Sequence, residues 1–137
     1  MNKKVLVVDD DAETRLILSD YLSRLEVEHT LASSAGECLA CLVNDPDGYG
    51  IVLMDIHMPS LSGVDASTWI KDSDIDPPRN TPIIALTGDE TYHDESYVAR
   101  FGMRGVLPKP VTEERLKETL KKHAGYSPQH NRRKYLN

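Results

Sequence analysis

Short apolar runs alternate with helical patterns five times along the chain. The predicted strands lie at 4–8, 28–32, 51–55, 81–87 and 105–108. Most of them contain a brief continuous apolar run, which is typical of buried strands. The stretches that follow repeat apolar residues every three or four positions, as one face of a helix requires. These predicted helices cover 12–25, 35–44, 64–73, 94–101 and 113–125. Alternating strands and helices predict a parallel sheet with helices on both faces.

Capping and turn residues mark several of the element boundaries. The second helix is expected to begin at a capping serine, Ser33 or Ser34, and to end at the turn residues DPDGYG (45–50). A loop from Pro59 to Gly63 should precede the third helix. Gly102 is placed to end the fourth helix, because glycine readily adopts the left-handed conformation of a helix end.

The composition limits the number of domains and the possible partners. With 137 residues the chain fits one domain, predicted at 1–124, followed by a C-terminal tail or linker at 125–137. A net charge of −6 argues against direct binding of nucleic acid. No apolar run approaches the roughly 18 residues of a membrane span, and the five-residue run after MNKK is too short for a signal peptide. We therefore expect a cytoplasmic protein without a membrane partner.

Two cysteines, Cys38 and Cys41, form a C-x-x-C pattern. Such a pair can be a redox couple or half of a metal site. The apolar spacing around it predicts the middle of a helix, whereas redox pairs are activated at a helix N-terminus. We interpret both as small, partly buried helix residues.

Chemically active side chains follow four of the predicted strands: Asp9, Asp10 and Asp11; Asp55; Thr87; and Lys109. In an open parallel sheet, ligands bind outside the carboxyl ends of the strands, so these groups should gather at one edge. The acids at 9–11 could instead simply cap the first helix. The concentration of acids, a hydroxyl and an ammonium at one edge favours a site.

The chemistry of this set points to phosphoryl transfer with Mg²⁺. Crowded carboxylates repel one another and need a counter-charge, and hard oxygen ligands suit Mg²⁺, with Asp10 and Asp55 as direct ligands. Beside a metal, the Asp55 carboxylate can attack phosphorus to give an acyl phosphate. Thr87 and Lys109 are expected to contact the phosphoryl oxygens. No strong general base is needed, because a carboxylate is ordinarily ionised at neutral pH.

Four motifs in order, covering about residues 3–124, resemble the receiver domain of two-component response regulators. They are VVDD at 7–10, LMDIHMPSLSG at 53–63, ALTG at 85–88 and LPKP at 107–110. The segments MDIHMP and PIIALTG most resemble the receivers of hybrid histidine kinases. The resemblance implies a flavodoxin-like, doubly wound (βα)5 three-layer sandwich with strand order 2-1-3-4-5.

The resemblance also implies roles for individual residues. Asp55 would take a phosphoryl group from a phosphohistidine on a histidine kinase or histidine phosphotransfer domain. Mg²⁺ would be held by Asp10, Asp55 and the backbone carbonyl of His57, with Asp9 helping through water. The peptide bond before Pro110 would be cis. The protein would be a signalling phosphoacceptor, not an enzyme beyond its own phosphorylation and dephosphorylation.

The sequence departs from the family at the switch. Many receivers carry an aromatic residue on strand five that moves together with the threonine, Thr87 here, and this chain has Val106 at that position. Gly88 would let substrate approach. We hypothesise that His57 and Asp89 flank the phosphoryl group and set the lifetime of the acyl phosphate; the alternative is that both are solvated loop residues.

Two other functions remain open at this stage. A phosphatase of the haloacid dehalogenase type needs a second acid two residues after the nucleophile, where this chain has His57, and a cap domain for which there is no room. A receiver-like docking domain would never be phosphorylated, but such domains usually lack the full set of acids, threonine and lysine. A receiver would signal by docking its fourth-helix, fifth-strand and fifth-helix face onto an output domain or protein, whether it stands alone or belongs to a larger protein.

Overall fold

The computed structural model describes residues 3–58, 62–72, 80–90 and 93–127. These residues form a parallel five-stranded sheet in the order β2-β1-β3-β4-β5. The strands are β1 (Lys4–Val8), β2 (His29–Ala32), β3 (Tyr49–Asp55), β4 (Ile83–Thr87) and β5 (Gly105–Pro108). The predicted strand order and doubly wound architecture are therefore confirmed.

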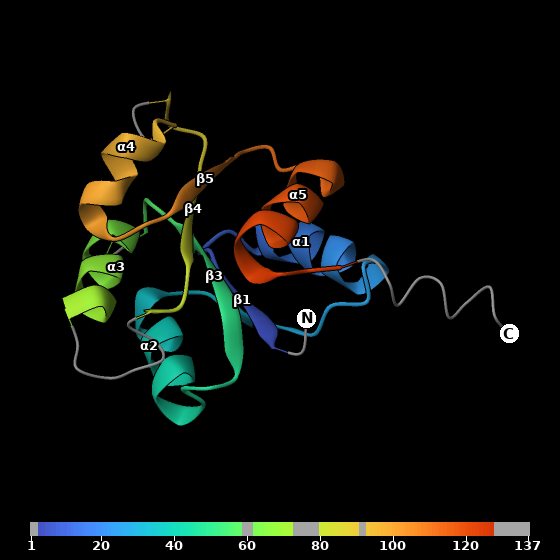
Figure 1. The fold of residues 1–137 in the computed structure, drawn as a ribbon, viewed down its shortest axis with the longest axis horizontal. Coiled ribbons are helices and arrows are strands. Elements are labelled where there is room, and N and C mark those ends of the chain that lie inside the picture. Colours follow the sequence, from blue (N-terminus) through green and yellow to red (C-terminus); the bar gives the residue numbers. More distant parts are fainter. Residues whose placement is uncertain (1–2, 59–61, 73–79, 91–92, 128–137) are drawn as a thin grey trace, which may run out of the picture.

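Helices cover both faces of the sheet (Figure 1). One face carries α1 (Ala12–Arg24) and α5 (Glu113–Ala124), and the other carries α2 (Ala35–Asn44), α3 (Gly63–Asp72) and α4 (Glu95–Val98). Each face has its own core of buried apolar side chains, to which alternate residues of the central strands contribute. Continuous apolar strands follow from this arrangement, since both faces of each central strand are covered.

Strand β3 begins earlier than expected. The turn predicted over 45–50 was wrong for its last two residues, because Tyr49 and Gly50 belong to the strand and Tyr49 pairs with Lys4 of β1. The Tyr49 side chain is buried, which explains why it extends the strand. The predicted loop before α3 also ends one residue early, since Gly63 is the first residue of that helix. Positions 59–61 of that loop lie outside the described residues.

The fourth helical segment is not one continuous α-helix. Four residues form α4, and a 3-10 helix, η3 (Ala99–Phe101), follows directly. Gly102 ends the segment with φ 82°, as predicted from its position. Ser34, and not Ser33, caps α2, because its hydroxyl accepts a hydrogen bond from the Glu37 N–H at 3.1 Å.

Packing continues past the end of α5. Gly125 adopts a left-handed conformation, and Tyr126 turns back so that its ring is buried with the core beside α1. Its hydroxyl donates a long hydrogen bond of 3.4 Å to the carbonyl of Leu25. The folded unit thus includes at least two residues beyond the predicted boundary at 124.

Cys38 and Cys41 lie in the middle of α2, as predicted, and both are free thiols. Burial, with a smaller contribution from Cys41, raises the pKa of Cys38 to about 12. A thiol of this kind stays protonated at neutral pH, so very little of the nucleophilic thiolate forms.

Among the described residues, no helix is long and apolar enough to cross a membrane.

Candidate functional site

The sheet brings the predicted site residues to one edge. Thr87 pairs with Pro108 of β5, and Asp55 pairs with Leu86 of β4, so three strand ends lie in register. Asp9 follows β1 directly, beside the end of β3. Lys109 follows β5 and joins this group. The edge predicted from the sequence therefore exists in the structure.

Three carboxylates form the acidic centre of this edge. Asp9, Asp10 and Asp55 each offer one oxygen, and these oxygens lie within 4.8 Å of one another. Asp9 and Asp55 are buried, whereas Asp10 is exposed. Asp11 is separate from the cluster. It caps α1, with side-chain oxygens that accept hydrogen bonds from the N–H of Glu13 and the hydroxyl of Thr14.

Lys109 supplies the counter-charge to the acids. Its Nζ lies 2.7 Å from Oδ2 of Asp9 and 3.5 Å from Oδ1 of Asp55. Burial disfavours the charged ammonium, but hydrogen bonding and charge attraction to Asp9 and Asp55 outweigh it, so the pKa of Lys109 is raised. The lysine therefore remains a cation at neutral pH.

Asp55 lies in an unusual electrostatic environment. Burial first, and then the nearby Asp9 carboxylate, raise its pKa to about 7. The Lys109 ammonium and the His57 N–H, which donates to Oδ1 of Asp55 at 3.2 Å, act in the opposite direction. Without a further cation the negative charge on Asp55 is thus poorly stabilised, contrary to the expectation of an ordinarily ionised carboxylate.

The acidic centre fits Mg²⁺ by its donor set. It offers oxygens alone, two of them on Asp10 and Asp55, as Mg²⁺ prefers. Oδ2 of Asp9 is buried, and the Lys109 ammonium lies 2.7 Å from it. Lys109 is shared between two buried acids, so a bound cation would relieve the remaining repulsion between Asp9 and Asp55.

Thr87 is buried at the end of β4 and anchored at both of its oxygens. Its hydroxyl accepts a hydrogen bond from the Asp89 N–H at 2.9 Å, and its carbonyl accepts from the Lys109 N–H at 2.9 Å. At Gly88 a Cβ would lie 3.8 Å from Cβ of Lys109, which is ordinary contact. The fold alone therefore does not require glycine at 88.

His57 and Asp89, each two positions after a residue of the site, contact each other. Nε2 of His57 lies 3.1 Å from Oδ2 of Asp89, and their side chains are 62% and 40% exposed. Both were predicted to flank the phosphoryl group, but their contact with each other was not foreseen. The pair joins the segments that follow β3 and β4.

Sequence reasoning missed two residues that contact the backbone next to the site without belonging to the acidic cluster. Arg15 of α1 donates a hydrogen bond from Nη1 to the Asp9 carbonyl at 2.7 Å. His93 contacts the Thr87 carbonyl through Nε2 at 3.1 Å. Both lie six positions after the residue that they contact, outside any strand end, so no motif or periodicity pointed to them. The peptide bond before Pro110 is cis, as predicted.

A sequence profile of the family described as response regulator receiver domain matches residues 5–121, most of the chain. The chain belongs to this family. It is 29% identical over 126 residues to the polar-differentiation response regulator DivK of Brucella ovis, covering 91% of this chain and 98% of DivK. It is 30% identical over 123 residues to the transcription factor SKN7 of Chaetomium thermophilum, covering 90% of this chain but 16% of SKN7.

Solved structures agree with this assignment. The chemotaxis protein CheY4 of Vibrio cholerae matches with a TM-score of 0.79 at 26% identity, covering 90% of this chain and 99% of CheY4. A response regulator receiver domain protein of Clostridium thermocellum matches with a TM-score of 0.78 at 27% identity, covering 98% and 99% of the two chains. The expected role as a receiver in two-component signal transduction is confirmed.

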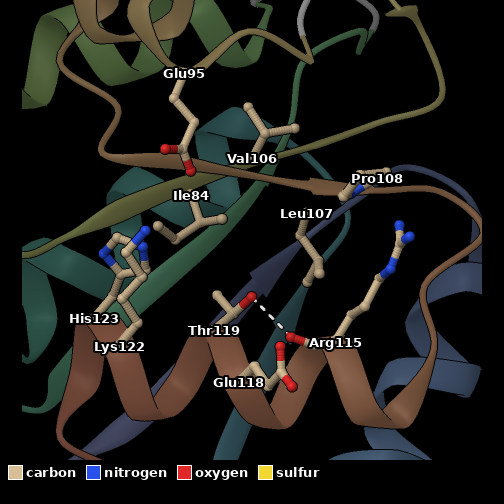
Figure 2. Close-up of a pocket in the computed structure, with 10 residues that line it drawn as sticks. All are labelled: Ile84, Glu95, Val106, Leu107, Pro108, Arg115, Glu118, Thr119, Lys122 and His123. Atoms are coloured by element: carbon tan, nitrogen blue, oxygen red, sulfur yellow. Dashed lines mark hydrogen bonds between the residues drawn. The ribbon is translucent and has the colours of Figure 1, made fainter.

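The receiver domain has a hollow of about 330 Å³ between α4, β5 and α5 (Figure 2). Apolar side chains, among them Ile84 and Leu107, form its floor, and Glu95 and Lys122 approach it from the two helices. Val106 lines the hollow and is only partly buried. A short aliphatic side chain at 106 leaves this space between the helices open.

Proposed function

We propose that this receiver domain accepts a phosphoryl group on Asp55. The observation that carries the proposal is the position of this carboxylate. It stands at the end of a central strand, 5% exposed, beside two further acids and with the Lys109 ammonium 3.5 Å from its Oδ1. A carboxylate nucleophile next to a fixed cation is the arrangement that aspartyl phosphorylation needs.

Mg²⁺ is the proposed cofactor. Asp10, Asp55 and the backbone carbonyl of His57 would bind it directly, and Asp9 would help through a water molecule. When bound, it neutralises negative charge on the transferring phosphoryl oxygens. Its positive charge also favours the ionised form of Asp55, against the burial that raises the pKa of this acid.

The residues of the chain then perform one in-line transfer. A carboxylate oxygen of Asp55 forms a bond to phosphorus as the bond between phosphorus and the imidazole nitrogen of the donor histidine breaks. The electron pair of the broken bond returns to that nitrogen, which takes up a proton from water. Lys109 neutralises charge on one phosphoryl oxygen, and the Thr87 hydroxyl, once released from the Asp89 N–H, donates a hydrogen bond to another.

The phosphoryl donor would be a histidine kinase or a histidine phosphotransfer domain that docks beside α1. Leu16 and Ile17 on this helix are 70% and 41% exposed. A hollow of about 450 Å³ lies between α1 and the segment of Lys109, Pro110 and Val111. Exposed apolar side chains next to the acceptor acid suit a protein partner. A co-crystal of Saccharomyces cerevisiae Ypd1 and the Ssk1 receiver shows this class of partner for another receiver.

The output surface is proposed at α4, β5 and α5, where the hollow of Figure 2 lies. An output domain or protein would dock there when Thr87 moves toward the phosphoryl group. Val106 takes the place of the usual aromatic partner of this switch, so its own movement would be smaller. The apolar floor and charged rim of the hollow support binding of a protein segment.

His57 and Asp89 would set the lifetime of the acyl phosphate. Their contact at 3.1 Å, between the residues two positions after Asp55 and Thr87, supports a shared role. The His57→Ala and Asp89→Ala variants should change the rate of dephosphorylation in the same direction, and the double variant should add little. Unchanged decay of the acyl phosphate in both single variants would refute this role.

Intact mass after exposure to acetyl phosphate and Mg²⁺ tests the phosphoacceptor. The wild type should gain the mass of one phosphoryl group, and the gain should disappear with Asp55→Asn or with a chelator. Asp11→Asn is the matched control, because it removes a neighbouring acid but keeps a side chain that can cap α1. No gain in the wild type would favour a docking domain that is never phosphorylated. Turnover of a phosphate ester would favour a phosphatase.

A further inference from the structure

His93 joins the phosphoacceptor edge to the start of α4. Its ring nitrogen Nε2 lies 3.1 Å from the carbonyl oxygen of Thr87. A carbonyl oxygen only accepts hydrogen bonds, so Nε2 must carry the hydrogen and donate it. His93 is half-buried.

The same carbonyl binds a second donor. The Lys109 N–H reaches the Thr87 carbonyl at 2.9 Å, so one oxygen connects the end of β4 with the residue after β5 and with His93. The Thr87 side chain is held separately, by the Asp89 N–H. A change in the position of Thr87 therefore acts on two backbone segments at once through its carbonyl.

His93 stands directly before the cap of α4. Asp94 is the N-cap, and its side chain accepts a hydrogen bond from the Ser96 N–H at 2.8 Å. The His93 N–H in turn donates to the Glu90 carbonyl at 3.1 Å. The imidazole is thus a short side-chain connection between Thr87 and the first turn of a helix that has only four residues.

We infer that His93 is a positioning residue that transmits the movement of Thr87 to α4. The inference deepens the proposed function and rests on it, because the proposed movement of Thr87 follows phosphorylation of Asp55. Val106 cannot substitute for this connection, since it has no hydrogen-bonding group on its side chain. Through His93, a movement of Thr87 can change the position of α4 without an aromatic residue on β5.

Hydrogen exchange in phosphorylated and unphosphorylated protein tests the link. Phosphorylation with acetyl phosphate and Mg²⁺ should change the exchange rates of the Tyr97 and Val98 amides, both of which donate to the Asp94 carbonyl. In His93→Ala this change should shrink by about fivefold, the effect of losing one neutral hydrogen bond. The mass gained by phosphorylation should stay the same, because His93 does not contact the acids.

Two further variants separate the link from a general structural effect. His93→Gln keeps an N–H donor at a similar reach and should restore the response of α4 to phosphorylation. His29→Ala is the matched control: this histidine is also half-buried and uses both ring nitrogens, toward Ser19 and the Val27 carbonyl, but lies on β2 far from α4. It should leave the response unchanged.

The outcomes separate the His93 link from the proposed phosphoacceptor function of Asp55. Normal phosphorylation with an undiminished α4 response in His93→Ala would overturn the link and leave the phosphoacceptor intact. A wild type that is phosphorylated without any change in α4 would also overturn the link. A wild type that gains no phosphoryl group would overturn the proposed function, and the link with it. Failure of His93→Gln to restore the response would show that the donated hydrogen bond is not its basis.

Discussion

The position of Asp55 serves its chemistry at the expense of the stability of the fold. Its carboxylate is buried beside Asp9, and the raised pKa means that the folded protein resists its ionisation. A nucleophile must be ionised to attack phosphorus, so the site depends on added positive charge. Lys109 provides part of it, and the acids provide a place for a divalent cation.

We predict that Asp55→Asn stabilises the protein in Mg²⁺-free buffer. Folding raises the pKa of Asp55 from 3.8 to about 7, so this group stabilises the folded state most below pH 3.8 and loses that contribution as the pH rises to about 7. The amide carries no charge to bury. At about pH 8 the free energy of unfolding, measured with urea, should exceed that of the wild type by at least about 1 kcal/mol.

The pH profile provides the control for this prediction. The advantage of Asp55→Asn should be small near pH 4 and grow toward pH 7. Asp11→Asn should show the opposite trend, because hydrogen bonds from the Thr14 hydroxyl and the Glu13 N–H lower the pKa of Asp11 and so stabilise the fold at higher pH. An Asp55→Asn variant less stable than the wild type at pH 8 would show that its ion pair with Lys109 outweighs burial.

Residue-level prediction from the sequence worked where chemistry coincides with a strand end. Asp9, Asp55, Thr87 and Lys109 could be placed because parallel strands bring their carboxyl ends to one edge. His93 could not, since its contact depends on the path of a loop that no periodicity describes. The pKa of Asp55 was likewise beyond the sequence, because it follows from burial and from the distance to neighbouring charges.

At the scale of elements, alternation predicted the strands and α-helices of the described residues, but local packing decided where some begin. Tyr49 belongs to β3 because its ring is buried, although the turn residues before it suggested a longer loop. The segment after β4 contains only one turn of α-helix before η3, although apolar spacing suggested one helix. Spacing alone does not distinguish an α-helix from a short 3-10 continuation.

Gly63 shows how closely α3 approaches β3. A Cβ at this position would overlap the backbone carbonyl of Asp55. We predict that Gly63→Ala lowers the free energy of unfolding by about 2 kcal/mol or more, since neither backbone can move freely. Because the displaced carbonyl belongs to the phosphoacceptor, phosphorylation by acetyl phosphate should also become slower.

Gly36→Ala is the matched control for this prediction. Gly36 lies in α2, and the atom nearest to an added Cβ there would be the Ser34 hydroxyl at 3.8 Å. This substitution should stabilise the protein by about 0.5–1 kcal/mol, because alanine favours a helix over glycine. Similar urea midpoints for the two alanine variants would show that α3 can shift away from β3 at little cost.

At the scale of the whole molecule, Tyr126 packs the end of the fold against the region of α1. The buried ring lies against the core of the α1 and α5 face, more than a hundred positions along the chain from the Leu25 carbonyl that its hydroxyl reaches. We predict that Tyr126→Ala lowers the free energy of unfolding by about 3 kcal/mol, and Tyr126→Phe by less than about 1 kcal/mol. Urea unfolding of the three proteins measures both changes. Equal stability of the alanine variant and the wild type would mean that the fold ends with α5.

Mg²⁺ should stabilise the whole molecule through the acidic edge. A ligand that binds only the folded state adds about 2.7 kcal/mol at a concentration one hundred times its dissociation constant. The wild type should therefore unfold at a higher temperature in Mg²⁺ than with a chelator. The rise should nearly disappear in Asp10→Asn, which removes an exposed ligand, and persist in Asp11→Asn, which removes an acid outside the cluster.

Asp55→Asn distinguishes specific binding from a general effect of ions. It should be more stable than the wild type without Mg²⁺, yet gain little when Mg²⁺ is added, because the repulsion that the ion relieves and a ligand that holds it are both gone. The melting temperatures of the wild type and of Asp55→Asn should therefore converge as the Mg²⁺ concentration increases. Parallel rises in all four proteins would mean that Mg²⁺ merely screens a chain of net charge −6 and has no site at the strand ends.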